Sequence, residues 1–136
     1  MFKRIFFWGL TAGILSAVAS IIYQQIHEFA TYTDFSKVLG IPVIIAVNLI
    51  GGVLAAIAFW ICVKLFKKNS ELIFNLLLSM GSFASVIYPI FYFKLPLDIP
   101  MPEMFPLLTV PMHFLPAIAW FTIRPLFAKK PFTEAN

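Results

Sequence analysis

The sequence predicts an all-α polytopic membrane protein, a compact four-transmembrane-helix bundle with both chain ends in the cytoplasm. Of its 136 residues, 61% are hydrophobic and 12% are charged, whereas soluble domains carry roughly 25% charged residues. The hydrophobic residues gather into four stretches, each close to the roughly 20 residues that a spanning helix needs. Basic residues lie at the ends of these stretches and not in one patch, so the net charge of +4 indicates a membrane surface and no nucleic-acid partner.

The four expected spans cover residues 5–26, 41–65, 72–92 and 107–127, within a single domain of residues 1–136. Each span must be helical, because the hydrocarbon core of a bilayer offers no hydrogen-bond partner to a free backbone group. A closed β-barrel is excluded because the stretches lack the alternation of apolar and polar residues that barrel strands have.

The first span has a competing interpretation as a secretory signal. Two basic residues precede an apolar run, and the Ala-Val-Ala sequence at residues 17–19 resembles a cleavage site. The apolar run continues to Tyr23, however, and is long enough to cross a membrane. We therefore expect an uncleaved first helix.

The distribution of lysine and arginine predicts the orientation. Eight of them lie on one side of the expected spans, namely Lys3, Arg4, Lys64, Lys67, Lys68, Arg124, Lys129 and Lys130. Only Lys37 and Lys94 lie on the other side. Because basic residues near span ends stay in the cytoplasm, we expect both termini there, in a membrane such as the bacterial inner membrane.

Each expected span carries one stripe of small or weakly polar residues at helical spacing. Small residues let helix backbones approach each other in a membrane, so the stripes are expected to face inward. Gly9 and Gly13 form a G-x-x-x-G pair, which we interpret as packing within the chain and not as a dimer contact. The stripes are Gly9, Gly13, Ser16, Ala17, Ser20, Gln24 and His27; Asn48, Gly51, Gly52, Ala55, Phe59 and Cys62; Asn75, Ser79, Ser82, Ser85 and Pro89; and Thr109, His113, Ala117, Trp120 and Arg124.

Prolines and aromatic residues mark the ends and interruptions of the spans. Pro111 and Pro116 each remove a backbone donor, so the fourth span is expected to bend or to begin as a separate short turn. Pro89 likewise removes a backbone donor, so an interruption is expected near the end of the third span. Trp8 lies near a span end, where an aromatic side chain is expected to anchor at the headgroups.

Polar side chains from all four spans are expected at similar depth. At about 1.5 Å per residue, Asn48 and His113 lie roughly 10 Å inside the outer surface. The candidate ligand-binding residues are Ser20, Gln24, Asn48, Ser85, Tyr88 and His113. Polar groups inside a membrane tend to be functional, which predicts a pocket around His113. The competing interpretation is that these groups only join helices, at about 0.6 kcal/mol each.

The sequence lacks the residues that several classes of function require. Cys62 is the single cysteine, so no disulfide and no C-x-x-C motif can form. No H-x-x-H or H-E-x-x-H spacing supports a metal site, and no nucleophile elbow, phosphate loop or dinucleotide fingerprint is present. No aspartate or glutamate lies within an expected span, as proton-coupled export would need. We therefore expect no cofactor and favour a protein that is not an enzyme.

Two functions remain, and a third is less favoured than either. The first is a non-enzymatic bundle that binds a lipid, a small ligand or a membrane partner through its outer half, its partners being membrane lipids, a second copy or another membrane protein. The alternative is an oligomeric small transporter or channel that uses the polar cluster around His113. An enzyme acting on lipids, with His113 as its base, is third. A dry centre favours the first, a continuous wet path the second, and a lipid-sized groove beside His113 the third.

Overall fold

The computed structural model describes residues 1–92 and 94–127, and every regular element in these ranges is helical. The α-helices are α1 (Phe2–Thr31), α2 (Ile41–Phe66), α3 (Ser70–Ser85) and α4 (Phe105–Phe127). Short 3-10 turns cover Lys67–Asn69 and Pro102–Met104, and a π-helical turn covers Tyr88–Tyr92. The expected all-α class is confirmed for this part of the chain. Of the basic residues used to predict the orientation, Lys129 and Lys130 lie outside it.

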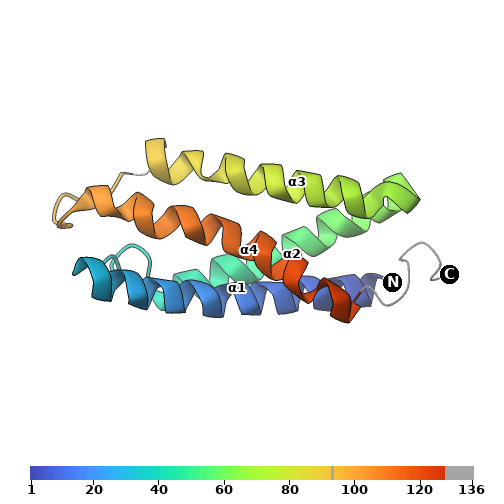
Figure 1. Ribbon diagram of the computed structural model, residues 1–136, viewed down its shortest axis with the longest axis horizontal. Helices are drawn as coiled ribbons and strands as arrows, with labels where there is room; N and C mark the ends of the chain where they lie inside the picture. The colour runs from blue at the N-terminus through green and yellow to red at the C-terminus, as the bar shows by residue number, and fades with distance from the viewer. Residues whose placement is uncertain (93, 128–136) are drawn as a thin grey trace.

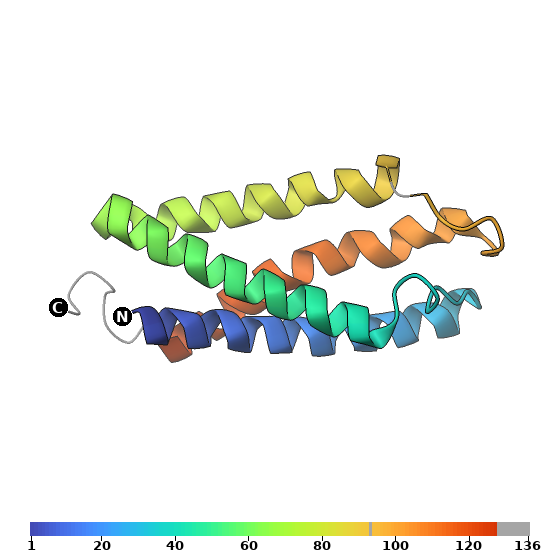
Figure 2. The ribbon, with the colours of Figure 1, turned by 180° about the vertical axis from the view of Figure 1, so that it is seen from behind.

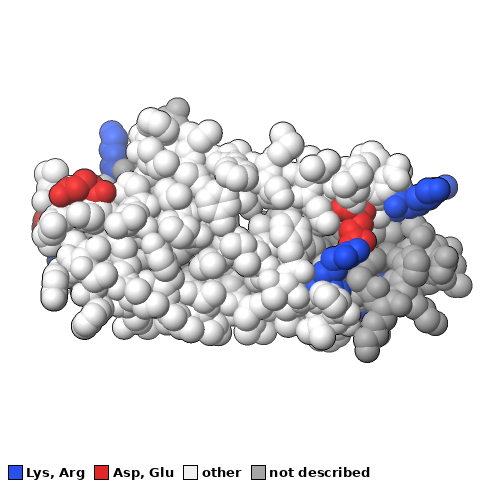
Figure 3. Space-filling view, viewed as in Figure 1, with Lys and Arg blue, Asp and Glu red and all other residues white. Residues whose placement is uncertain are grey.

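Within the described ranges, three continuous helical stretches are long and apolar enough to cross a membrane: Phe2–Thr31, Ile41–Phe91 and Pro102–Phe127. The second is 51 residues long because it contains both α2 and α3. On the face drawn in Figure 3, charged side chains gather at the two ends of the elongated molecule, and the surface between them is uncharged. These features indicate an integral membrane protein.

A tight reversal at Lys67 separates α2 from α3. Lys67 has a φ of 45°, a left-handed value that ends α2. Figures 1 and 2 show that α2 and α3 meet at this reversal and diverge toward the opposite end of the molecule. Both α2 and α4 pack along α1, whereas α3 packs mainly on α2 and α4.

The backbones of α1 and α2 touch where the two helices cross. A Cβ atom at Gly13 would lie 2.7 Å from the backbone oxygen of Asn48, and one at Gly9 or Gly52 would overlap the carbonyl oxygen of the other. Only glycine fits at such an approach. Gly9 and Gly13 therefore pack within the chain, as predicted. The whole predicted stripe of α1 is buried: Gly9, Gly13, Ser16, Ala17, Ser20, Gln24 and His27.

An aromatic core fills the half of the molecule near the reversal. The rings of Trp8 and Trp120 stack with their centroids 4.2 Å apart, and Phe59 meets Trp8 edge-on at 5.4 Å. The Trp8 Nε1 atom donates a hydrogen bond to the backbone oxygen of Trp120 at 3.1 Å. The prediction that Trp8 anchors at the headgroups is wrong, because its indole finds a stacking partner and an acceptor inside the core and is fully buried there.

α3 departs from the prediction both at its end and along its face. The α-helix ends at Ser85 and not at residue 92. Pro89 explains this end, because it has no N–H to donate to the carbonyl of Ser85 and its ring would clash with that oxygen. Ser82 is buried, but Ser85 is exposed and Asn75 is only half-buried. The predicted inward stripe of this helix is therefore only partly correct, because α3 diverges from α2.

α4 continues through Pro111 and Pro116 as one helix. Pro111 leaves the carbonyl of Leu107 without its helical donor. The hydroxyl of Tyr23, on α1, donates to that oxygen at 2.9 Å. Because α1 supplies the missing hydrogen bond, the separate short turn that the prolines allowed does not form. Figure 1 shows the C-terminal part of α4 coming down toward α1.

The loops at the end opposite the reversal have a small core of their own. Phe35 and Ile99, one from each loop, pack with Phe105 and Leu108 at the start of α4. The Lys37 Nζ atom donates to a carboxylate oxygen of Asp98 at 2.9 Å, which joins the two loops on their exposed side.

Candidate functional site

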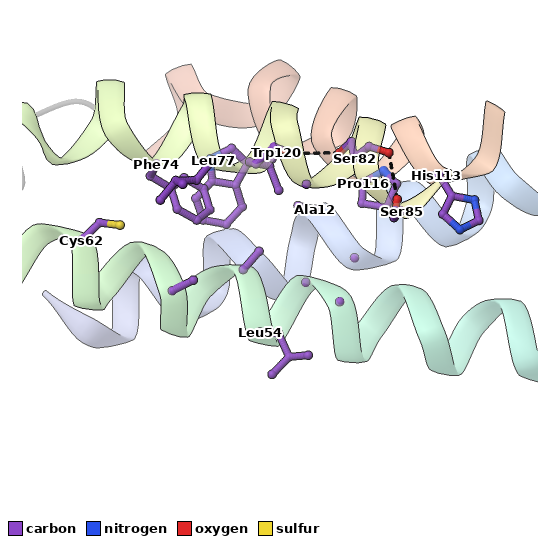
Figure 4. A pocket seen from close by; sticks show the side chains of 17 residues that line it. Ala12, Leu54, Cys62, Phe74, Leu77, Ser82, Ser85, His113, Pro116 and Trp120 are labelled. Carbon is purple, nitrogen blue, oxygen red and sulfur yellow. Dashed lines mark hydrogen bonds between the residues drawn. The ribbon is translucent and has the colours of Figure 1, made fainter. Parts of the chain in front are cut away.

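A groove opens between α2 and α3 where the two helices diverge, and α1 and α4 form its back wall (Figure 4). Its turn-side compartment, nearer the reversal at Lys67, has a volume of about 410 Å³. Its loop-side compartment, nearer residues 32–40, has a volume of about 360 Å³. Ser85, His113 and Pro116 line both compartments, so the two adjoin at this point.

The turn-side compartment is apolar and has its opening partway along α2 and α3. Small residues of α2 face leucines of α3 across it. A Cβ atom at Gly51 or Gly81 would meet no other atom within 4 Å, so these two glycines leave space that larger residues would fill. Leu54 and Leu77 line the compartment and are 59% and 55% exposed. The opening is therefore sideways, between the helices, and not at an end of the molecule.

The loop-side compartment is the more polar part of the groove. Its polar lining residues are Ser20, Asn48, Ser85, Thr109 and His113. Apolar residues of α2, including Val43 and Val47, cover much of the remaining wall. Four of the six predicted site residues therefore meet in one compartment, although they come from four different helices.

His113 is held in one orientation by its own helix. The Nδ1 atom lies 2.7 Å from the backbone oxygen of Thr109, one turn earlier in α4. A carbonyl oxygen only accepts, so Nδ1 carries the hydrogen in this bond. In the neutral ring the other nitrogen, Nε2, then has a free lone pair and acts as an acceptor. His113 is half-buried, and Figure 4 shows its ring projecting from α4 toward α2, beside Ser85.

Asn48 and Ser20 are both buried, but they differ in how their hydrogen bonds are satisfied. Asn48 Oδ1 accepts from Ser16 Oγ at 2.5 Å, and Asn48 Nδ2 donates to the backbone oxygen of Ile44 at 2.8 Å. Asn48 therefore joins α1 to α2, as the competing interpretation expected. Ser20 is 1% exposed, and its Oγ atom has no hydrogen-bond partner within the described part of the chain.

The other two predicted site residues lie away from the groove. Gln24 is buried beneath the loop that follows α1, where its Nε2 atom donates to the backbone oxygen of Leu39 at 2.8 Å. Tyr88 is 60% exposed in the π-helical turn beyond α3. Thr109 lines the groove but was absent from the predicted set, although it belongs to the same stripe of α4 as His113.

No charged side chain lines either compartment in the part of the chain that the structure describes. The two ion pairs seen there lie at the ends of the molecule, between Lys37 and Asp98 and between Arg124 and Glu71. The described residues also contain no group of three or more His, Cys, Asp or Glu side chains that could hold a metal ion. The groove therefore offers apolar contact and a few neutral polar groups.

Comparisons of the chain with known protein families, with curated proteins and with solved structures found no match. The fold and the groove define it by class, as an integral membrane protein with a largely apolar groove that opens sideways between two of its helices.

Proposed function

We propose that α1, α2, α3 and α4 each cross the membrane, with both termini in the cytoplasm. The reversal at Lys67 supports separate crossings for α2 and α3 within their 51-residue stretch. Helical structure reaches from Ser70 to Tyr92 with one irregular turn, about the length that a span requires. In this arrangement the reversal and both termini lie on the side with most of the basic residues.

We further propose that the protein is not an enzyme and that its groove binds the hydrocarbon chain of a membrane lipid. The observation that carries this proposal is the sideways opening between Leu54 and Leu77, partway along the helices. In a bilayer such an opening faces lipid and not water. Each compartment falls in the range of about 300–1,000 Å³ that ligand sites occupy. An empty groove would leave its walls without dispersion contacts, and a lipid chain is the nearest group that restores them.

One observation favours a second candidate function, an enzyme acting on lipids. The groove passes directly beside His113, which is the arrangement expected from the sequence to favour this enzyme. Against it, Ser85 Oγ donates to the backbone oxygen of Ser82 at 2.8 Å, and no carboxylate lines the groove among the described residues. Chemical change in the bound lipid during the assay below would favour this candidate. No comparable observation singles out the oligomeric transporter.

The test uses tryptophan fluorescence, because Trp120 lines the turn-side compartment and Trp8 stacks on it. Trp60 is replaced by phenylalanine, so that only these two buried indoles emit. The protein is placed in bilayers whose phospholipid chains carry bromine, which quenches an indole in near contact. We expect quenching, because a chain in the groove reaches Trp120.

A matched pair of variants locates the quencher. Gly51→Leu adds bulk to the groove at a position where a Cβ atom would meet no other atom within 4 Å, and it should remove most of the quenching. Ala46→Leu adds a similar bulk to the exposed surface of α2 outside both compartments, and it should leave the quenching unchanged. No quenching in the Trp60→Phe protein, or equal quenching in both leucine variants, would overturn the proposal.

A further inference from the structure

We propose that the groove selects a lipid whose head is an uncharged hydroxyl group, such as a diacylglycerol, and holds that head in the loop-side compartment. This inference rests on the proposed binding of a lipid chain in the groove. It adds the chemistry of the head, which the apolar turn-side compartment does not determine.

Ser20 provides the first observation. The residue lines the loop-side compartment, and its Oγ atom is shielded from solvent and has no hydrogen-bond partner among the described residues. A buried hydroxyl without a partner is unfavourable, because it has lost its hydrogen bonds to water and gained none. After a rotation of the Ser20 side chain toward this compartment, a polar atom of a ligand would restore the missing bond.

His113 provides the second observation, independently of Ser20. Because Nδ1 is bound to the backbone oxygen of Thr109, the neutral ring offers the compartment an acceptor at Nε2. A hydroxyl group both donates and accepts. Its chemistry therefore matches both groups, the acceptor at His113 Nε2 and the donor at Ser20 Oγ, whereas an ester or ether oxygen only accepts.

The charge of the lining disfavours a phosphate head in the loop-side compartment relative to an uncharged one. Neither compartment has a lysine or arginine among its described lining residues. A phosphate moved into such a site would lose its hydration without meeting a cation, which is costly in a low dielectric. An uncharged head avoids this cost. The turn-side compartment, next to the shared wall at Ser85 and Pro116, then receives the hydrocarbon chain.

The experiment is a displacement assay on the Trp60→Phe protein in mild detergent, preloaded with a brominated phospholipid. Three competitors share the same two acyl chains: 1,2-diacylglycerol, its 3-acetyl ester, and phosphatidic acid. We expect the diacylglycerol to relieve quenching at about tenfold lower concentration than either of the others, the effect of about one hydrogen-bonded polar group. Ser20→Ala and His113→Phe should each reduce this preference while chain binding persists. Ser79→Ala removes a hydroxyl from α3 outside both compartments, and it should change nothing.

Each outcome separates the two proposals. Equal displacement by all three competitors, or preference for phosphatidic acid, overturns the selection of a hydroxyl head but leaves chain binding intact. A preference that survives in both Ser20→Ala and His113→Phe also overturns it. Failure of the brominated lipid to quench at all, by contrast, overturns the proposed function itself.

Discussion

Gly13 and Gly52 form the close backbone contact on which the packing of α1 against α2 depends. Each lies where the neighbouring backbone is closer than a Cβ atom tolerates, and the nearest atoms belong to main chain and not to a flexible side chain. Backbone atoms cannot move aside as a side-chain end can. Any larger residue at these positions must therefore push the two helices apart, and it would also disturb the neighbouring bond between Ser16 and Asn48.

Leucine at either glycine should destabilise the fold. For Gly13→Leu and Gly52→Leu we expect losses of about 1–3 kcal/mol or more, because overpacking against backbone is hard to relieve. Ile14→Leu, one residue along α1 on its exposed face, should cost far less. Thermal unfolding in detergent measures the difference. Similar melting temperatures for all three variants would mean that these glycines do not form the contact.

Several residues could be predicted from the sequence because their position depends on helical periodicity alone. The buried face of α1 and the meeting of Ser20, Asn48 and His113 in one compartment follow from regular spacing. The burial of Trp8 could not be predicted in this way, because its indole is held by Trp120, which is 112 positions away in the sequence. Contacts between distant helices depend on how the helices cross, which no local pattern specifies.

At the scale of elements, the divergence of α3 from α2 creates the groove, and the sequence gives little sign of it. The stripe of α3 resembles those of the other helices, yet Ser85 is exposed at the groove. Pro89 did predict an interruption, and the α-helix does end four residues earlier. The effect of Pro111 could not be predicted, because the hydroxyl of Tyr23 compensates for the lost hydrogen bond from another helix.

The two loops at the wide end of the groove are joined by Lys37 and Asp98, and this ion pair should depend on pH. The hydrogen bond from Lys37, and then its charge, lower the pKa of Asp98, and the same bond raises the pKa of Lys37. The Asp98 carboxylate therefore contributes its full stabilisation at pH values above the ordinary pKa of an aspartate. This stabilisation is lost as pH falls through the lowered pKa of Asp98. The Lys37 ammonium group contributes its full stabilisation at pH values below the ordinary pKa of a lysine. This stabilisation is lost as pH rises through the raised pKa of Lys37.

Acidification should therefore loosen the loops. Spin labels at Ser36 and Leu97, in a protein with Cys62 replaced by alanine, would report the distance between them. We expect the distance distribution to broaden below the lowered pKa of Asp98. The change should be modest, because the two side chains are 71% and 64% exposed and solvent screens their attraction.

Asp98→Asn should already show the broad distribution at neutral pH and should not respond to acid. Glu103→Gln changes another exposed acid of the same loop and should leave the response intact. A distribution that stays narrow at every pH in the unsubstituted pair would show that Phe35 and Ile99, and not the ion pair, hold the loops together.

At the scale of the whole molecule, the distribution of charged residues and the packing of the helices agree on which parts of the chain lie at each end. The loops that contain Lys37 and Asp98 lie at one end, and the reversal at Lys67 lies at the other, together with the start of α1 and the end of α4 (Figures 1 and 2). The uncharged surface between them fits the hydrocarbon core of a bilayer. The class of the protein could be predicted because it depends on composition and length, which need no knowledge of helix crossings.

The proposed orientation predicts which residues an impermeant thiol reagent reaches in intact cells. With Cys62 replaced by alanine, single cysteines at Lys37 and Lys94 should be labelled from outside, because both lie in the loops between spans on the side with few basic residues. Cysteines at Lys67, in the reversal, and at Lys129, outside the described residues, should be labelled only after the cells are permeabilised. That second treatment is the control, because it proves that the unlabelled thiols are reactive. Labelling at Lys67 in intact cells would place the reversal outside and invert the orientation. A spanning α2 places Lys37 and Lys67 on opposite sides of the membrane, so one of them must be labelled in either orientation. Protection of both would mean that α2 does not cross the membrane, and the four-span arrangement would have to be abandoned.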